Sequence, residues 1–149
     1  ELDIYGEGEL ENDMRAGVER LGIEDSVVMY GSVSDIAGMY AGSAMLLLCS
    51  RSEGLPMVII EAMRSGLPVV STDCPYGPAD IIKNGENGLL VAQDDDAAFV
   101  DAVSTLMEDG ARRMEMGKRA SETSVIYSKH NIVETWKSFW QSIGNSPLS

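Results

Sequence analysis

The stretch that decides the fold is residues 44–63, which read AMLLLCSRSEGLPMVIIEAM. It begins with Ala44–Leu48, an apolar run without alternation, as expected for a strand covered on both faces of a sheet. A loop containing Gly54 follows, and Pro56 stands at the position that proline favours in the first turn of a helix. The helix is expected to end at Gly66, which is suited to a C-cap. A strand joined to a helix in this way is typical of a βαβ unit.

The same alternation of strands and helices extends over the rest of the chain. Further short strands are predicted at Leu2–Tyr5, Val27–Tyr30, Val69–Thr72 and Leu89–Val91. The other predicted helices span Leu10–Leu21, Ala79–Lys83, Asp94–Glu108 and Asn131–Ile143, with Phe99, Val103 and Leu106 sharing one face. We therefore predict an α/β fold, a Rossmann-like doubly wound parallel sheet with helices on both faces. In such sheets ligands bind beyond the carboxyl ends of the strands.

Composition and charge exclude several classes of function. The chain has 149 residues, which fits one domain, and its 11 Lys and Arg against 24 Asp and Glu give a net charge of −13. Such a charge repels polyanions, so we expect no nucleic-acid partner. Cys49 and Cys74 lack metal-ligand spacing and are expected to be free, buried thiols. With His130 as the single histidine, neither a zinc site nor a histidine-based triad is expected.

The loop after the first strand argues against a dinucleotide cofactor. Gly6 and Gly8 resemble the start of the dinucleotide fingerprint, but the third glycine of that pattern would fall at Glu11. A glutamate at that place would repel a pyrophosphate. A tight turn into a helix is therefore the preferred interpretation of this loop.

The loop at residues 50–56 is the strongest candidate for an anion site. Backbone amides of Gly54, Leu55 and Met57 would point from a helix N-terminus, where the helix dipole favours negative charge. Glu61 is the one acidic residue in an otherwise apolar stretch, where burial of a carboxylate without hydrogen-bond donors would cost several kcal/mol. It would pair with Arg64 three residues later, or accept hydrogen bonds from a pair of vicinal hydroxyls such as a ribose diol.

Several motifs resemble the retaining glycosyltransferases of family 4 with the GT-B fold. Their two glutamates separated by seven residues match Glu53 and Glu61, although the same spacing also occurs at Glu1/Glu9 and Glu11/Glu19. The sequence around the pair is what distinguishes it. The further matching segments are 6–8, 27–33, 52–56, 61–70, 72–75, 77–78, 81–82 and 84–91.

The resemblance implies a role for each matching residue. Glu61 would hold the ribose hydroxyls of a nucleoside-diphosphate sugar, with a UDP-sugar favoured, and Glu53 would be the catalytic residue that contacts the transferred sugar. The segment Gly54, Leu55, Pro56 and Met57 would face the sugar and the distal phosphate. The loop from Gly31 to Val33 would lie against the nucleobase. No metal and no resident cofactor are implied, and Arg51 is either a helper or a surface residue without a role.

The resemblance also implies that residues 1–149 form a donor-binding domain incomplete at its N-terminus. The first, central strand of the usual sheet, between Leu2–Tyr5 and Ala44–Leu48, and the acceptor-binding domain would be missing. The acceptor would be a glycan or a lipid-linked glycan in bacterial surface-polysaccharide synthesis. The protein would be cytoplasmic, with a peripheral position of the parent protein at the inner membrane face left open. Two alternatives remain: a non-catalytic nucleotide-sugar-binding module, and a sugar-nucleotide epimerase of the same architecture.

The last predicted helix carries three aromatic residues, Trp136, Phe139 and Trp140. They would pack on this domain or form a docking surface for the other domain of the parent protein. If they stayed exposed, they would favour self-association.

Overall fold

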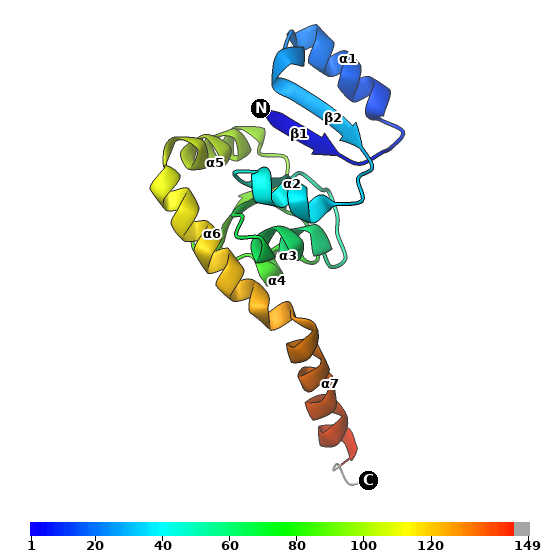
Figure 1. The fold of residues 1–149 in the computed structure, drawn as a ribbon, viewed down its shortest axis with the longest axis vertical. Helices are drawn as coiled ribbons and strands as arrows, with labels where there is room; N and C mark the ends of the chain where they lie inside the picture. The colour runs from blue at the N-terminus through cyan, green and yellow to red at the C-terminus, as the bar shows by residue number, and fades with distance from the viewer. Residues whose placement is uncertain (145–149) are drawn as a thin grey trace. The chain divides into compact units, whose positions relative to one another are not determined.

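The computed structural model describes residues 1–144, and it contains two compact units, Glu1–Ile36 and Ala37–Ser149. The elements of both units are labelled in Figure 1. Each unit is built from parallel strands connected through helices, which confirms the predicted α/β class with a parallel sheet. The strands on the two sides of the expected gap belong to different sheets, because β1 pairs with β2 and β3 pairs with β4.

The first unit is a single βαβ motif. Strand β1 (Leu2–Tyr5) pairs in parallel with β2 (Val27–Gly31), and helix α1 (Glu11–Leu21) and a short 3-10 turn, η1 (Glu24–Ser26), connect them. The rings of Tyr5 and Tyr30 stack with their centroids 5.0 Å apart. No residue of this unit is buried, because one helix and two strands cannot enclose a core.

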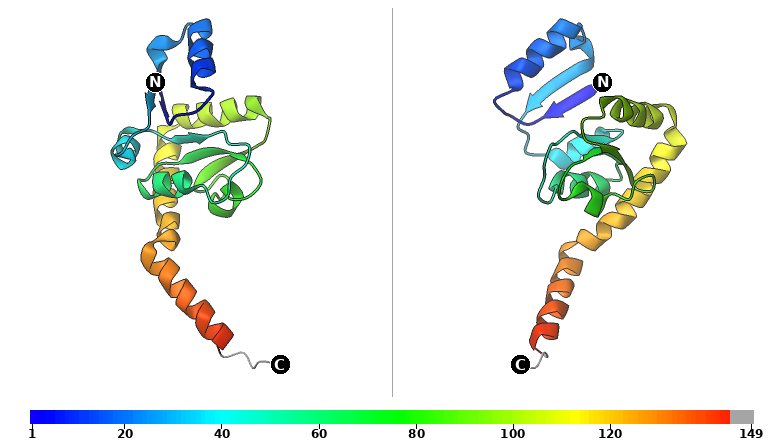
Figure 2. Two further views of the ribbon diagram at one scale, coloured as in Figure 1. Left: turned by 90° about the vertical axis from the view of Figure 1, so that its right-hand side faces the viewer. Right: turned by 180° about the vertical axis from the view of Figure 1, so that it is seen from behind.

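The second unit holds the three-stranded sheet β3-β4-β5, with strands Leu46–Leu48, Val69–Asp73 and Gly88–Ala92. The helices before β5 are α2 (Ile36–Gly42), whose first residue closes unit 1, α3 (Met57–Arg64) and α4 (Pro78–Ile81). The helices after it are α5 (Asp96–Glu108), α6 (Gly110–Ser124) and α7 (Lys129–Gly144), with the 3-10 turn η2 (Val125–Tyr127) between the last two. Helix α5 covers one face of the sheet, and α3 and α4 cover the other (Figure 2).

The core of this unit lies around the central strand β4. Val70 and Val91 from the sheet meet Leu106 of α5 and Met116 of α6, and Leu106 is fully buried. Phe99 and Val103 pack against this cluster, which confirms the apolar face predicted for that helix. Ile59, Met63 and Val69 are also completely buried and fill the α3 side of the sheet.

Helices α2 and α6 were not predicted from the sequence. In α6 the buried positions are Met116, Gly117, Ala120 and Ser124, so apart from Met116 its inward face is small or polar and gives no apolar period. Gly117 is needed there because a Cβ would collide with the Gly66 carbonyl. Asp109 separates α6 from α5 and caps it, since its Oδ1 accepts from the Arg112 amide at 2.8 Å.

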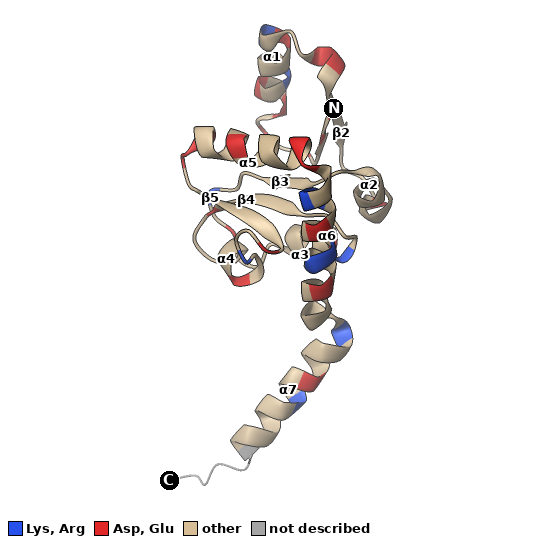
Figure 3. Cartoon of the chain, turned by 90° about the vertical axis from the view of Figure 1, so that its left-hand side faces the viewer, with Lys and Arg blue, Asp and Glu red and all other residues tan. Residues whose placement is uncertain are grey.

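The aromatic residues of α7 do not pack on the rest of unit 2, so the first of the two predicted alternatives is wrong. Trp136, Phe139 and Trp140 are 55%, 49% and 62% exposed and contact one another, with ring centroids 5.8–6.3 Å apart. Few charges lie along this helix (Figure 3). Among the described residues no helix combines the length and the apolar character needed to span a bilayer.

Candidate functional site

The loop at residues 50–56 connects β3 to α3 at the carboxyl edge of the sheet of unit 2. Thr72, in β4, donates from its Oγ1 to the carbonyl of Ser50 at 2.7 Å. Gln93, just after β5, donates from its Nε2 to the carbonyl of Arg51 at 2.6 Å. Residues at the ends of all three strands of this sheet therefore meet at one edge, as the parallel topology predicts.

Glu53 is half-buried in this loop, and one of its carboxylate oxygens is fixed. Its Oε1 accepts from the Ser50 hydroxyl at 2.6 Å, and its amide donates to the Pro75 carbonyl at 3.5 Å. Within residues 1–144 the second carboxylate oxygen, Oε2, has no hydrogen-bond partner. Glu53 thus presents a preorganised acceptor that is free to bind a hydroxyl group.

The residues after Glu53 form the N-terminus of α3. Pro56 is buried and occupies the N-cap, one residue before the position predicted for it, because the Ile59 amide bonds to the Pro56 carbonyl at 3.0 Å. Leu55 and Met57 are 56% and 51% exposed. In the described part of the chain, the amides of Gly54, Leu55 and Met57 donate to no other group. These unused donors at a helix N-terminus suit an anion.

Gly77 supports this loop from the segment after β4. Its φ of +111° lies where residues with a side chain are strained, and a Cβ there would collide with Pro56 Cδ and lie 2.8 Å from the Gly54 oxygen. Pro78 then starts α4. The turn around Gly77 therefore packs directly against the backbone that carries the free amides.

Glu61 differs from its predicted environment because it is exposed. An exposed carboxylate keeps its hydration, so the expected cost of burying it does not arise. The pairing with Arg64 is not formed either, since the ion pairs within residues 1–144 are Arg15–Glu11, Arg119–Glu115 and Lys137–Glu134. Burial, and secondly the charge of Glu61, raise the pKa of the neighbouring Tyr40. The Glu61 carboxylate is thus available to a ligand.

Gly31 and Val33, predicted to lie against a nucleobase, belong to unit 1. Gly31 ends β2 with a φ of +70°, and its carbonyl accepts from the Gly6 amide at 2.7 Å. The Ser32 amide donates to Glu7 Oε1 at 3.3 Å, and Val33 is half-buried. The loops after β1 and β2 are therefore bonded together, and the turn that leads into α1 is closed by the Glu11 amide, which donates to the Gly8 carbonyl at 3.1 Å. Glu53–Met57 and Glu61 lie in unit 2, on the loop after β3 and the helix α3 that follows it, while Gly31 and Val33 are described with unit 1 alone.

Three residues that hold the loop in place were missed in the sequence. Ser50, Thr72 and Gln93 act through hydrogen bonds to residues 3, 22 and 42 positions away. Their polar character at the ends of predicted strands is the one signal that could have identified them. The Arg51 side chain is exposed. The backbone carbonyl of Arg51 helps to hold the loop, because it accepts the hydrogen bond from Gln93.

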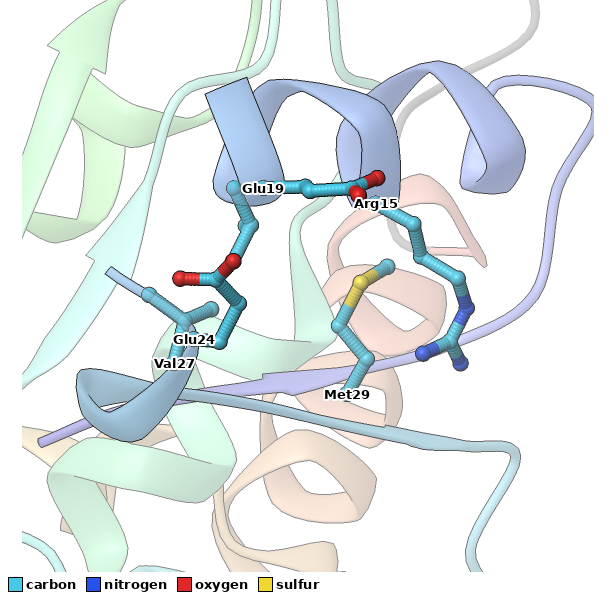
Figure 4. Close-up of a pocket in the computed structure, with 6 residues that line it drawn as sticks. Arg15, Glu19, Glu24, Val27 and Met29 are labelled. Atoms are coloured by element: carbon cyan, nitrogen blue, oxygen red, sulfur yellow. The ribbon is translucent and has the colours of Figure 1, made fainter. Parts of the chain in front are cut away.

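The cysteines and the cavities add no further candidate. Cys74 is buried as predicted, but Cys49 is exposed because it follows the short edge strand β3. A cavity of about 450 Å³ lies between α1 and β2 in unit 1 (Figure 4). It is lined by Arg15, Val18, Glu19, Glu24, Val27 and Met29, so it contains none of the predicted site residues. Within residues 1–144 no three His, Cys, Asp or Glu side chains are grouped to hold a metal ion.

Comparisons with known proteins give a consistent result. The family model described as glycosyl transferases group 1 matches residues 1–123. An uncharacterized glycosyltransferase of Haemophilus influenzae is 34% identical over 136 residues, covering 91% of this chain and 38% of that protein. A TarM variant of S. aureus, solved with fondaparinux, α-GlcNAc-glycerol and UDP, has a TM-score of 0.85 at 29% identity, covering 97% of this chain and 29% of that chain. The pneumococcal O-GlcNAc transferase GtfA in complex with UDP and GlcNAc has a TM-score of 0.83 at 26% identity, with coverage of 97% and 29%. The chain thus spans less than half the length of each of these proteins.

Proposed function

The chain belongs to the family of group 1 glycosyl transferases, and from this premise we propose that it is the donor-binding part of a two-domain retaining glycosyltransferase. The enzyme moves a sugar from a nucleoside-diphosphate sugar to a glycan or lipid-linked acceptor in surface-polysaccharide synthesis. UDP is the favoured nucleotide, because both similar solved structures described above contain it. The acceptor-binding domain belongs to the rest of a longer parent protein, a proposal supported by the 38% of the Haemophilus relative that the chain spans.

The observation that carries this proposal is the order of chemical groups around the start of α3. Free amides lie in the short segment between two available carboxylates, Glu53 and Glu61. A nucleoside-diphosphate sugar has a matching order of groups: a ribose diol, a diphosphate and the hydroxyls of the sugar. Carboxylates accept hydrogen bonds from hydroxyls, and amides at a helix N-terminus bind phosphate oxygens. Glu61 therefore binds the ribose, the amides of Gly54, Leu55 and Met57 bind the diphosphate, and Glu53 binds the sugar.

Transfer then depends on stabilising the diphosphate that leaves. The bond between the anomeric carbon and the diphosphate oxygen breaks, the acceptor oxygen bonds to that carbon, and the acceptor proton leaves with the nucleoside diphosphate. Amides already pointing at the developing charge cost no reorganisation during the reaction. Glu53 orients the sugar for attack on one face. No metal and no resident cofactor form part of this proposal.

Glu61→Gln in the full-length protein tests the ribose assignment. Loss of a charged hydrogen-bond acceptor costs about 1.5–3 kcal/mol, so affinity for UDP should fall about 10- to 150-fold in isothermal titration calorimetry. Glu108→Gln removes the same charge from an exposed position at the end of α5 and should leave the affinity unchanged. Equal UDP affinity in the Glu61 variant and the wild type would overturn the assignment. Thermal-shift screening with UDP-, GDP- and ADP-sugars identifies the base.

Glu53→Gln separates an enzyme from a binding module. If Glu53 orients the transferred sugar, the variant should lose transfer while keeping its affinity for UDP. Undiminished transfer by this variant, together with weakened donor binding by Glu61→Gln, would instead identify a nucleotide-sugar-binding module in which Glu53 has no catalytic role.

A further inference from the structure

The loop that carries Glu53 is held by hydrogen bonds from its own Ser50 and from β4, and we propose that Ser50 and Thr72 are positioning residues for the Glu53 carboxylate. The inference rests on the proposed function, because it concerns how Glu53 receives the hydroxyls of the donor sugar. Ser50 fixes the carboxylate directly, and Thr72 fixes the backbone from which Ser50 acts. Neither residue contacts the donor in this scheme.

Ser50 determines which oxygen of Glu53 is available. Its hydroxyl donates to Oε1 at 2.6 Å, a short hydrogen bond of the kind that charge assistance produces. Both residues are half-buried, and they are separated by only three positions. A glutamate side chain has several rotatable bonds, and ordering it for a ligand costs conformational entropy. Because Ser50 orders the carboxylate in advance, that cost is removed from donor binding.

Thr72 adds a side-chain hydrogen bond between β4 and the chain after β3, just beyond the last backbone pair of these two strands. The ladder between β3 and β4 ends at Leu48 and Ser71, and the Thr72 hydroxyl then bonds to the Ser50 carbonyl at 2.7 Å. Ser71 and Val70 are fully buried, so this part of β4 is a rigid support. The bond therefore fixes the Ser50 backbone relative to the buried strand. The Ser50 hydroxyl in turn fixes the Glu53 carboxylate.

Gln93 secures the loop independently of this path. It bonds to the Arg51 carbonyl at 2.6 Å from the segment after β5. Arg51 lies between Ser50 and Glu53, so the backbone that joins these two residues has a second restraint. This second tether means that loss of one hydroxyl should loosen the carboxylate without releasing the loop.

The test measures how much the sugar adds to nucleotide affinity in the full-length protein. The quantity is the ratio of the Kd for UDP to the Kd for UDP-GlcNAc or UDP-glucose, whichever binds more tightly, determined by calorimetry. Ser50→Ala and Thr72→Val should each lower this ratio about 3- to 10-fold, the range expected for one lost hydrogen bond, with UDP affinity unchanged. Thr72→Ser, which keeps the hydroxyl, should restore the wild-type ratio. If the two residues had a purely structural role, the variants would bind UDP and the UDP-sugar more weakly by the same factor. That result would overturn the inference.

A double-mutant cycle gives a second, independent decision. If Ser50 acts through Glu53, Ser50→Ala should not lower the affinity ratio further in a Glu53→Ala background, where the Ser50 hydroxyl has lost its acceptor. Additive losses would refute the positioning role. If Ser50→Ala does not fold, the comparison of Thr72→Val with Thr72→Ser decides in its place. Absence of any nucleotide binding by the wild-type protein would contradict the proposed function itself, whereas an unchanged ratio in variants of a UDP-sugar-binding protein would contradict only this inference.

Discussion

Replacing Gly77 with alanine tests whether the turn after β4 supports the loop that is proposed to bind the diphosphate. The added Cβ would overlap Pro56 Cδ and lie 2.8 Å from the Gly54 oxygen, in a backbone conformation with φ +111°. Pro56 is buried against the rest of the unit, so it cannot simply move away. The substitution must therefore displace the loop, distort the turn, or do both.

Two terms set the size of the effect of Gly77→Ala. A residue with a side chain held in such a backbone region costs about 1–3 kcal/mol. Forcing an extra methyl group into a closely packed contact costs a further ~1–3 kcal/mol. Because the structure relaxes partially, we expect the free energy of unfolding to fall by about 3 kcal/mol. This corresponds to a decrease in Tm of roughly 12 °C or more for a domain of about 100 residues.

Gly85→Ala is the matched control for this experiment. Gly85 also has a positive φ, of +80°, but a Cβ built there would meet nothing within 4 Å. It therefore carries the conformational strain without the collision, and the expected loss is about 1 kcal/mol. Both variants lose the same chain flexibility in the unfolded state, so that contribution cancels between them.

Urea denaturation and UDP calorimetry on the two variants give the answer. Gly77→Ala should be about 2 kcal/mol less stable than Gly85→Ala, the size of the packing term alone. It should also bind UDP more weakly, because the displaced backbone carries the free amides. If the two variants were equally stable and bound UDP equally well, the close contact between Gly77 and the loop would not support the site.

Three further predictions concern the rest of unit 2. Burial raises the pKa of Tyr40 above its ordinary value of 10.0, so the stability provided by the neutral phenol is complete below pH 10.0 and is lost as pH rises through the raised pKa. The free energy of unfolding of the wild type should therefore fall relative to that of Tyr40→Phe above pH 10.0, and a constant difference would contradict this. Asp95 Oδ1 accepts from the Ala98 amide at 3.0 Å, so Asp95→Ala should lower the free energy of unfolding in urea by about 1 kcal/mol. Asp101→Ala, on the exposed side of the same helix, should lower it by less than half as much. Leu106 is fully buried, and Leu106→Ala should cost about 2–5 kcal/mol; a value under 1 kcal/mol would mean that the cluster around it is loosely packed.

The strands and the longer amphipathic helices could be predicted because their signal is local. Residues 89–91 and 69–72 were predicted as strands, and the structure extends them to Gly88–Ala92 and Val69–Asp73. The helix predicted from Asp94 to Glu108 begins at Asp96, with Asp95 as its cap. In contrast, α6 shows no apolar period, since apart from Met116 its inward face is built from small residues, of which Gly117 fits against the Gly66 backbone.

Candidate site residues could be proposed from the sequence, but their arrangement could not. Glu53 and Glu61 were identified by the sequence around them, yet the sequence predicted a costly buried position for Glu61, which is exposed. Solvent exposure depends on what packs beside a helix, and residues 57–64 do not contain that information. The hydrogen bonds from Thr72 and Gln93 join positions far apart in the chain, and no local pattern encodes them.

The position of β3 explains why these distant bonds matter. It is the shortest strand, with three residues, and within the described residues it pairs on one side only, with β4. A short edge strand has few backbone hydrogen bonds with which to fix the loop that follows it. The order of that loop must therefore come from its neighbours, through Thr72 on β4, Gln93 after β5 and the close contact at Gly77. In the proposed function the motif at residues 52–61 supplies the groups that contact the donor, while Thr72 and the segments after β4 and β5 hold the loop that carries them.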